Sequence, residues 1–261
     1  MIDLDAMADA ARAAALAGGA VVTARYGAAR DVREKAPGDW VSEADLSSEQ
    51  AVRGALAVSA PGIPVFGEEA GGERGAIGWL VDPLDGTANF LHGFPIVGVS
   101  VALVEDGMPL VGVVHAPMLG DTYLAVRGRG AYRGEARLSV STRPAPNAIA
   151  ATGFPFRRKD RREQYLRVFD AAFERFEDLR RAGAASLDLA FTACGTFDGY
   201  FELSLGPWDV AAGALLVTEA GGVVTDWAGD DRRWLETGDI IAAPPEMHEQ
   251  LLDLARASTS A

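Results

Sequence analysis

The chain has 261 residues, of which 49% are hydrophobic and 23% are charged, a composition typical of a soluble globular protein. This length fits one large domain or two subdomains that share a core. The formal net charge is -13, so the overall field repels nucleic acid, and a phosphorylated ligand would need cations to reverse the local charge. We therefore expect no nucleic-acid partner.

The single cysteine and the first residues of the chain indicate in which cellular compartment the protein is expected. The single cysteine, Cys194, can form no disulfide within the chain, which favours a reducing environment. Asp3, Asp5, Asp9 and Arg12 stand among the first alanines, a pattern unlike a signal peptide. No apolar run approaches the roughly 18 residues that a membrane-spanning helix needs. The sequence thus predicts a cytoplasmic protein with no membrane partner.

The N-terminal half predicts two helices followed by strands. Apolar residues recur at helical spacing over residues 4–26, and a second helix is expected over residues 42–58, with Ser42 as its N-cap. A polar loop, REKAPGDW, lies between them. From residue 96 the pattern changes to the strands IVGVSVALV, PLVGVVHAP and DTYLAV, joined by turns. Their near-continuous apolar runs predict an antiparallel meander covered on both faces, by the first two helices on one side.

Strand-like and helical patterns alternate after the proline-containing connection STRPAPNA. The segments AIAATG, GYFEL and GVVTDW are typical of strands, whereas residues 164–177, 185–193 and 210–220 favour helices. This alternation indicates an α/β layer arrangement. We expect a subdomain boundary near residue 142. It separates an N-terminal α+β subdomain, residues 1–142, from a C-terminal α/β subdomain, residues 143–261.

Acidic residues stand where several apolar runs end. Asp82 and Asp85 follow the run WLV, Glu68 and Glu69 follow VF, and Asp209 begins an alanine-rich helix. Turn chemistry or simple helix capping explains each acid taken alone. Taken together they suggest a cluster of hard oxygen ligands without His or Cys, which favours Mg²⁺ or Mn²⁺. Two such ions about 4 Å apart would clamp a phosphoryl group and activate a water.

Three segments, GEE, WLVDPLDGTANFLHGFP and WDVAAGALLVTEAGG, occur in this order and together resemble the signatures of the inositol monophosphatase family. The resemblance covers nearly the whole chain. It implies a Mg²⁺-dependent, lithium-sensitive phosphomonoesterase with alternating α-β-α-β-α layers, usually a homodimer. Two or three Mg²⁺ ions would be bound, with Mn²⁺ as a substitute. The leading substrate would be inositol 1-phosphate, hydrolysed to inositol and phosphate by in-line attack of a metal-activated water.

The resemblance also assigns roles to individual residues. The metal ligands would be Glu68, Asp82, the carbonyl of Leu84, Asp85 and Asp209. The residues that orient and deprotonate the attacking water would be Thr87 and Glu68, with Asp45 supporting the threonine. The substrate contacts would come from Asp85, the N–H groups of Gly86 and Thr87, the backbone of Ala185, Glu202 and Asp209.

Some positions depart from the family pattern or allow two interpretations. Ala184 stands where Ser or Thr is usual and Ser186 where Ala is usual, which bears on substrate identity rather than on the metal chemistry. The loop EKAPGDWVSEAD is one residue shorter than the commonest version, so Lys35 is either the family's loop lysine or a solvated charge. Glu202 is otherwise an exposed strand acid. Cys194 is expected to be buried and inert in an apolar helix.

Several functions stay open at this point. The related activities are fructose-1,6-bisphosphatase, histidinol-phosphatase and adenosine 3′,5′-bisphosphate phosphatase, although GTANFLHG is closer to the inositol branch. The basic run RRKDRR, residues 157–162, is by default a solvated helix start, yet near the mouth of a site it would attract a second phosphate. The non-enzyme alternative is a phosphate-binding regulatory protein of the same fold. Retention of all the expected ligands favours catalysis.

Overall fold

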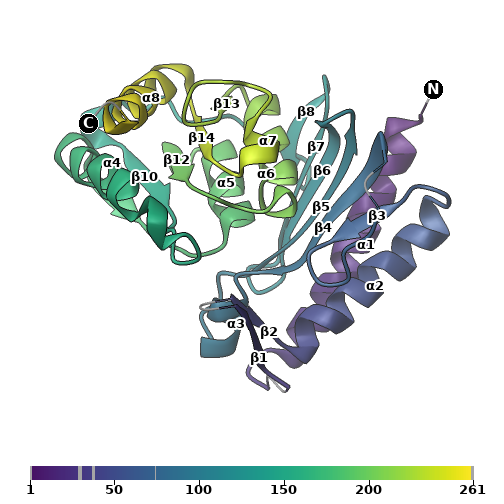
Figure 1. The fold of residues 1–261 in the computed structure, drawn as a ribbon. Helices are drawn as coiled ribbons and strands as arrows, with labels where there is room; N and C mark the ends of the chain where they lie inside the picture. The colour runs from purple at the N-terminus through teal and green to yellow at the C-terminus, as the bar shows by residue number, and fades with distance from the viewer. Residues whose placement is uncertain (1, 29–30, 37–38, 74, 260–261) are drawn as a thin grey trace.

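The computed structural model describes residues 2–28, 31–36, 39–73 and 75–259. It is built in α-β-α-β-α layers (Figure 1), which confirms the layered α/β class. Helices α1 (Leu4–Arg25) and α2 (Glu43–Ser59) cover one face of a seven-stranded sheet. Helices α5 (Ala185–Ala193) and α6 (Pro207–Glu219) lie between it and a five-stranded sheet, whose other face is covered by α4 (Arg162–Arg175) and α8 (Pro245–Thr259).

The seven-stranded sheet has the order β3-β4-β5-β6-β7-β8-β9. Its strands are β3 (Val65–Gly67), β4 (Ile77–Asp85), β5 (Gly98–Glu105), β6 (Met108–Ala116), β7 (Asp121–Val126), β8 (Gly130–Arg133) and β9 (Ala136–Arg137). Only β3 and β4 pair in parallel. Val99 and Val101 pack in the core under α1 and α2, whereas Ala102 and Val114 pack in the core with α6. The expected meander with cover on both faces is confirmed.

The five-stranded sheet has the order β11-β10-β12-β14-β13. Its strands are β10 (Ile149–Thr152), β11 (Asp178–Arg180), β12 (Gly199–Glu202), β13 (Val223–Thr225) and β14 (Ile240–Ala243). The expected boundary near residue 142 falls between the two sheets. Because α6 belongs to the second half and packs on the first sheet, both halves share one core. The division into two subdomains stays a prediction.

Close packing of α6 on the first sheet depends on small residues. A Cβ at Gly112 of β6 would lie 2.8 Å from the carbonyl oxygen of Ala212 in α6, so the backbones approach at a distance that no larger residue allows. This approach carries the start of α6 to the end of β4, where the acids of the sequence motifs lie. No helix in the described parts of the chain is long and apolar enough to cross a membrane.

Some local structure differs from the sequence prediction. The expected polar loop is a hairpin of β1 (Arg33–Ala36) and β2 (Asp39–Val41), whose residues 37–38 lie outside the described residues. Cys194 is the half-buried C-cap of α5 rather than a buried helix residue. Helices α3 (Thr87–His92) and α7 (Trp234–Thr237), and the 3-10 helices Ala145–Asn147 and Lys159–Arg161, complete the fold.

Candidate metal centre

Strand β4 ends in a bulge that turns Asp82 and Asp85 to the same face of the sheet. In a regular strand, residues three positions apart point to opposite faces. Here Asp82 pairs with Ser100 and Asp85 with Gly98, so three steps along β4 match two steps along β5. The extra residue falls within the Pro-Leu pair between the acids, and a bulge tolerates a proline that has no N–H. Both carboxylates therefore face α5 and α6.

Two other elements bring carboxylates to Asp82. Strand β3 runs parallel to β4, and the N–H of Glu68 donates to the carbonyl of Val81 at 3.0 Å, which places Glu68 beside Asp82. Asp209 lies in the first turn of α6, and its Oδ2 accepts from the N–H of Gly206 at 2.7 Å. Oxygen atoms of Glu68, Asp82 and Asp209 lie within 4.8 Å of one another. We call these three residues the carboxylate group.

Without a cation, burial and mutual repulsion make the ionised form of these carboxylates energetically unfavourable. Asp82 is 1% exposed and Asp209 is 8% exposed. Burial raises the pKa of both well above their usual values, and the charge of Glu68 raises the pKa of each further. Carboxylate oxygens without a His or Cys beside them are the ligands of hard divalent cations. The donor set therefore fits Mg²⁺ or Mn²⁺, which would remove the repulsion.

Asp85 faces the same cavity but is held by the first turn of α5. Its Oδ2 accepts from the N–H of Ser186 at 2.7 Å and from the Ser186 hydroxyl at 2.5 Å, and its Oδ1 accepts from the N–H of Ala185 at 3.2 Å. Burial raises the pKa of Asp85 to about 6, against the lowering effect of these hydrogen bonds. Ser186 thus contacts a predicted metal ligand, so its departure from the family pattern bears on that ligand directly.

Thr87, at the start of α3, is linked to the second helix. Its hydroxyl oxygen lies 2.8 Å from Oδ1 of Asp45 and 3.1 Å from the carbonyl oxygen of Leu84. Oδ2 of Asp45 accepts from the N–H and the hydroxyl of Ser42 at 2.8 and 2.7 Å, which forms the capping box of α2 and confirms Ser42 as N-cap. When the Thr87 hydroxyl donates to Asp45, its lone pairs stay available to a ligand.

Lys35 contacts the carboxylate group from the β1–β2 hairpin. Its Nζ lies 3.0 Å from Glu68 Oε1 and 2.7 Å from Glu69 Oε1. Partial burial alone would lower the pKa of Lys35, but the two carboxylates raise it above its usual value. Burial raises the pKa of Glu69 to about 7. The ion pairs contradict the interpretation of Lys35 as a merely solvated charge.

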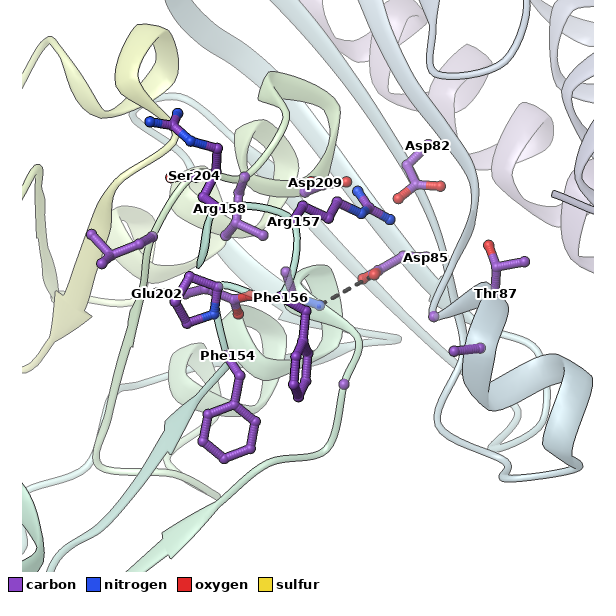
Figure 2. A pocket seen from close by; sticks show the side chains of 18 of the residues that line it. Asp82, Asp85, Thr87, Phe154, Phe156, Arg157, Arg158, Glu202, Ser204 and Asp209 are labelled. Carbon is purple, nitrogen blue, oxygen red and sulfur yellow. Dashed lines mark hydrogen bonds between the residues drawn. The ribbon is translucent and has the colours of Figure 1, made fainter. Parts of the chain in front are cut away.

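A cavity of about 160 Å³ opens in front of these residues, and Figure 2 shows Asp82, Asp85 and Asp209 around it. The predicted site residues that line it are Glu68, Asp82, Leu84, Asp85, Gly86, Thr87, Ala185, Glu202 and Asp209. Asp45 lies behind Thr87. Gly86 has φ 87°, and a Cβ there would lie 2.9 Å from the carbonyl oxygen of Ile96, so this position requires glycine.

Glu202 reaches the cavity from β12. The hydroxyl of Tyr200 donates to its Oε2 at 2.5 Å, and burial raises the pKa of Glu202 to about 7. A Cβ at Gly153 would clash with this carboxylate, so the glycine leaves the space that Glu202 fills. The alternative of an exposed strand acid is therefore contradicted.

Sequence reasoning missed two sets of residues around the site. Glu49 accepts from the N–H of Glu69 at 2.8 Å and pairs with Arg53 at 2.7 Å, which fixes the turn after β3. A pair four residues apart on a helix is a common surface pattern and gave no sign of this role. The other set lines the cavity: Trp40, Phe154, Phe156 and Arg181. These side chains come together only in the folded chain.

Fold and site together define a layered α/β protein with a group of carboxylates at a strand end that could hold a metal ion. A sequence model of the inositol monophosphatase family matches residues 3–260. The chain belongs to the inositol monophosphatase family.

The chain is similar to proteins named SuhB in several bacteria. A relative in Neisseria meningitidis, named putative Nus factor SuhB, is 44% identical over 227 residues, which cover 85% of this chain and 87% of the relative. Nus factor SuhB of Pseudomonas aeruginosa is 43% identical over 229 residues, with shares of 85% and 84%.

Solved structures of the family match the whole fold. The extragenic suppressor protein suhB of Bartonella henselae is 35% identical, with a TM-score of 0.90, over 95% of this chain and 97% of that one. The inositol monophosphatase of Anabaena is 32% identical, with a TM-score of 0.88, over 98% and 97% of the two chains.

Proposed function

We propose that this protein is a Mg²⁺-dependent phosphomonoesterase that hydrolyses a sugar or polyol phosphate, with inositol 1-phosphate as the leading substrate. The observation that carries the proposal is the carboxylate group, whose oxygens lie within 4.8 Å of one another at a cavity that Glu202 also lines. When bound there, Mg²⁺ supplies positive charge to the phosphate and the leaving oxygen, and lowers the pKa of a bound water. Family membership supports this activity.

The chain's own residues divide into ligands, a base and substrate contacts. Glu68, Asp82 and the Leu84 carbonyl would hold one ion, and Asp82, Asp85 and Asp209 would hold a second. Each of these residues lines the cavity. Two or three Mg²⁺ ions are proposed, and Mn²⁺ is a substitute because the donors are the same hard oxygens.

Thr87 and Asp45 act on the attacking water. The Thr87 hydroxyl donates to Asp45 at 2.8 Å, so its oxygen can accept a hydrogen bond from the water and orient the water's lone pair toward phosphorus. Glu68 takes the proton as attack proceeds. The N–H groups of Gly86 and Thr87 receive phosphate oxygens. Phosphoryl transfer of this kind needs positioning and charge stabilisation, with no covalent enzyme intermediate.

Glu202 and the Ala185 backbone bind the alcohol part of the substrate. In its ionised form the Glu202 carboxylate only accepts hydrogen bonds, which suits the hydroxyl groups of a sugar or polyol. Glu202 and Ala185 both line the cavity, together with the carboxylate group. This arrangement favours a hydroxyl-rich phosphate ester over an aromatic one.

The test is phosphate release, with and without Mg²⁺, from inositol 1-phosphate, fructose 1,6-bisphosphate, histidinol phosphate and adenosine 3′,5′-bisphosphate. We expect turnover that needs Mg²⁺ and is absent in Asp82→Asn. The kcat/KM values then rank inositol 1-phosphate against the three alternatives. Absence of turnover on all four esters, in protein that binds Mg²⁺, would reject the phosphatase assignment for these substrates.

A second candidate is a binding function that needs no turnover. It is favoured by the relatives named Nus factor SuhB, at 44% and 43% identity, since that name describes no enzyme. The Asp82→Asn gene would separate the two functions in a strain whose growth depends on this chain. Growth equal to that of the wild type would favour binding, and failure with normal protein levels would favour catalysis.

Two family properties are proposed with the activity. We propose a homodimer, which light scattering at micromolar concentration would reject by a monomer mass of about 27.4 kDa. We also propose inhibition by lithium, tested by measuring phosphate release at fixed Mg²⁺ over a series of LiCl concentrations. An unchanged rate, with KCl as the control salt, would contradict it.

A further inference from the structure

The wall of the cavity that the C-terminal half contributes carries arginines. Arg157, Arg158 and Arg181 line the cavity together with Phe154 and Phe156. The chain has a formal net charge of -13, so these cations oppose the field of the whole molecule. The carboxylates on one side of the cavity suit cations, and the guanidinium groups on the other side suit anionic groups of a ligand.

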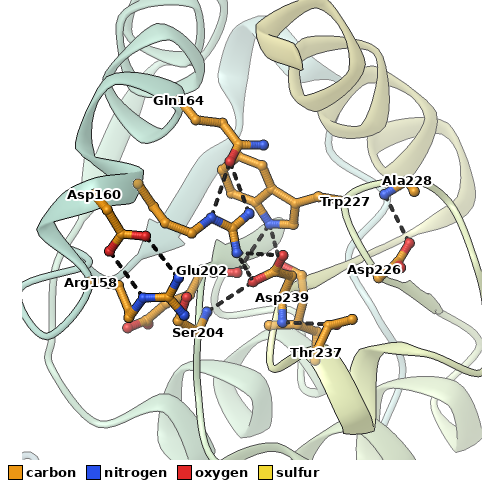
Figure 3. Close-up of polar contacts among 12 residues, drawn as sticks. Arg158, Asp160, Gln164, Glu202, Ser204, Asp226, Trp227, Ala228, Thr237 and Asp239 are labelled. Carbon is orange, nitrogen blue, oxygen red and sulfur yellow. Dashed lines mark hydrogen bonds and ion pairs between the residues drawn. The ribbon is translucent and has the colours of Figure 1, made fainter.

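The arginines differ in what they contact. Arg158 is occupied, because its Nε and Nη2 donate to Asp160 at 3.0 and 2.8 Å (Figure 3). Arg157 extends toward the carboxylates of Asp85 and Asp209 (Figure 2). Arg181 forms no hydrogen bond and no ion pair with any carboxylate in the described part of the chain. Its guanidinium is therefore the one of the three best placed to take a ligand.

The position of the Arg181 guanidinium is fixed by packing. Its central carbon lies 5.9 Å from the ring centre of Phe154 and 6.0 Å from that of Phe156. Gly183 has φ 87°, and a Cβ there would meet Nη1 of Arg181, so this glycine leaves room for the guanidinium where it lies. Aromatic faces hold the planar cation while its N–H edge stays available. The neighbouring Arg180 is ion-paired with Asp178 instead.

We propose that Arg181 binds a second anionic group when the substrate carries one, so that the cavity takes, beside a monophosphate such as inositol 1-phosphate, a sugar or polyol bisphosphate whose first phosphate lies at the carboxylate group. This inference rests on the proposed phosphatase function and names its substrate class. Paired N–H donors of a guanidinium match two phosphate oxygens. The hydroxyls between the two phosphates lie near Glu202, which also lines the cavity.

The test compares matched esters that differ only by the second phosphate. Inositol 1-phosphate is paired with inositol 1,4-bisphosphate, and fructose 1-phosphate with fructose 1,6-bisphosphate, at saturating Mg²⁺. Release of the first phosphate is measured for the wild type, Arg181→Gln, Arg181→Lys and Arg180→Gln. Arg180→Gln is the matched control, because it removes the same charge from the neighbouring residue. The Arg180 side chain is already paired with Asp178.

We expect the wild type to have a KM for at least one bisphosphate roughly tenfold below that of its monophosphate, as one charge-assisted contact implies. The ratio of the monophosphate KM to the bisphosphate KM should fall to about one in Arg181→Gln and take an intermediate value in Arg181→Lys. In Arg180→Gln it should equal the wild-type ratio. Rising KCl should reduce the wild-type ratio, because an exposed ion pair is screened.

Two kinds of failure are distinguishable. Equal KM values within both pairs, or a preference that survives Arg181→Gln, would overturn the second-anion site while leaving the phosphatase intact. No release from any ester by the wild type would overturn the phosphatase itself, and this inference with it. Thermal melting of each variant shows whether it is folded, and Arg181→Lys keeps the test open if Arg181→Gln does not fold.

Discussion

The hydroxyl of Ser186 donates a 2.5 Å hydrogen bond to Asp85, 101 residues earlier in the chain. Together with the backbone N–H of Ser186, it occupies both acceptor positions of Oδ2, while Oδ1 accepts from the N–H of Ala185 at 3.2 Å and keeps one lone pair for a cation. Contacts that orient a metal ligand typically contribute ~10-fold or more to metal affinity. We therefore expect Ser186→Ala to weaken Mg²⁺ binding by roughly tenfold, measured by calorimetry without substrate.

The control for Ser186→Ala moves the hydroxyl two residues, to the position where the family usually has one. Ala184→Ser combined with Ser186→Ala should recover part of the lost affinity if a hydroxyl near Asp85 is what matters. Identical Mg²⁺ affinity in the wild type and Ser186→Ala would show that the backbone N–H groups alone orient Asp85.

Thr87 is expected to affect turnover far more than metal binding. Its hydroxyl contacts Asp45 and the Leu84 carbonyl, whereas the carboxylate group lies on other elements. Thr87→Val should lower kcat by about 100-fold, since it removes the acceptor that orients the water, while calorimetric Mg²⁺ affinity changes little. Thr87→Ser keeps the hydroxyl and should retain most of the rate. Full turnover in Thr87→Val would remove Thr87 from the mechanism.

Lys35 should compete with metal ions for Glu68. Its Nζ lies 3.0 Å from Glu68 Oε1, so it partly neutralises a predicted ligand before a cation arrives. Lys35→Gln is expected to bind Mg²⁺ a few times more tightly and to melt at a lower temperature in EDTA. Lys159→Gln removes a lysine that does not line the cavity and serves as control. Weaker Mg²⁺ binding in Lys35→Gln would show that Lys35 supports the ion instead.

Because of Asp188, we expect the free energy of unfolding to depend on pH. It is 1% exposed, and neither carboxylate oxygen has a hydrogen-bond partner among the described residues. Burial raises its pKa well above the usual value, and the charges of Glu202 and Asp85 raise it further. The native state therefore holds a proton that the unfolded chain loses. The contribution of the protonated Asp188 to stability is fully present below the pKa of Asp in the unfolded chain, about 3.9. It is lost as the pH rises through the pKa of Asp188 in the native state.

Asp188→Asn removes this dependence, because the amide does not ionise. We expect it to melt a few degrees above the wild type at pH 8 in EDTA and to show no gain at pH 4. Asp198→Asn is the control, since it breaks the ion pair of the buried Asp198 with the exposed Arg143 at 2.8 Å and should lower the melting temperature at pH 8. An equal effect of Asp188→Asn at both pH values would contradict the buried-proton account.

The long elements were predictable from the sequence because their periodicity is local. The first two helices and the meander follow from apolar spacing and turn residues alone. The β1–β2 hairpin was missed because REKAPGDW is polar and its strands are only 4 and 3 residues long. Strand β14 and helix α8 were also missed, although a proline opens α8 and apolar residues recur along it. That signal was present and unused.

The site was predictable only in part. Acids that end strands are visible in sequence, which is why Asp82 and Asp85 were expected to act together. The bulge that brings them to one face depends on the pairing with β5, and a local pattern does not report register. Arg181 stacks on Phe154 and Phe156, more than 20 residues away in the chain. Such contacts arise from tertiary packing and have no local signature.

The carboxylate group joins residues that are far apart in the order of synthesis. Glu68 and Asp82 leave the ribosome long before Asp209, and α6 must then dock on β6, where Gly112 allows its backbone to approach. A nascent chain therefore lacks a complete cation site until most of it has been made. Because an ion that binds only the docked form stabilises that form, magnesium uptake would act as a late step that secures the finished fold.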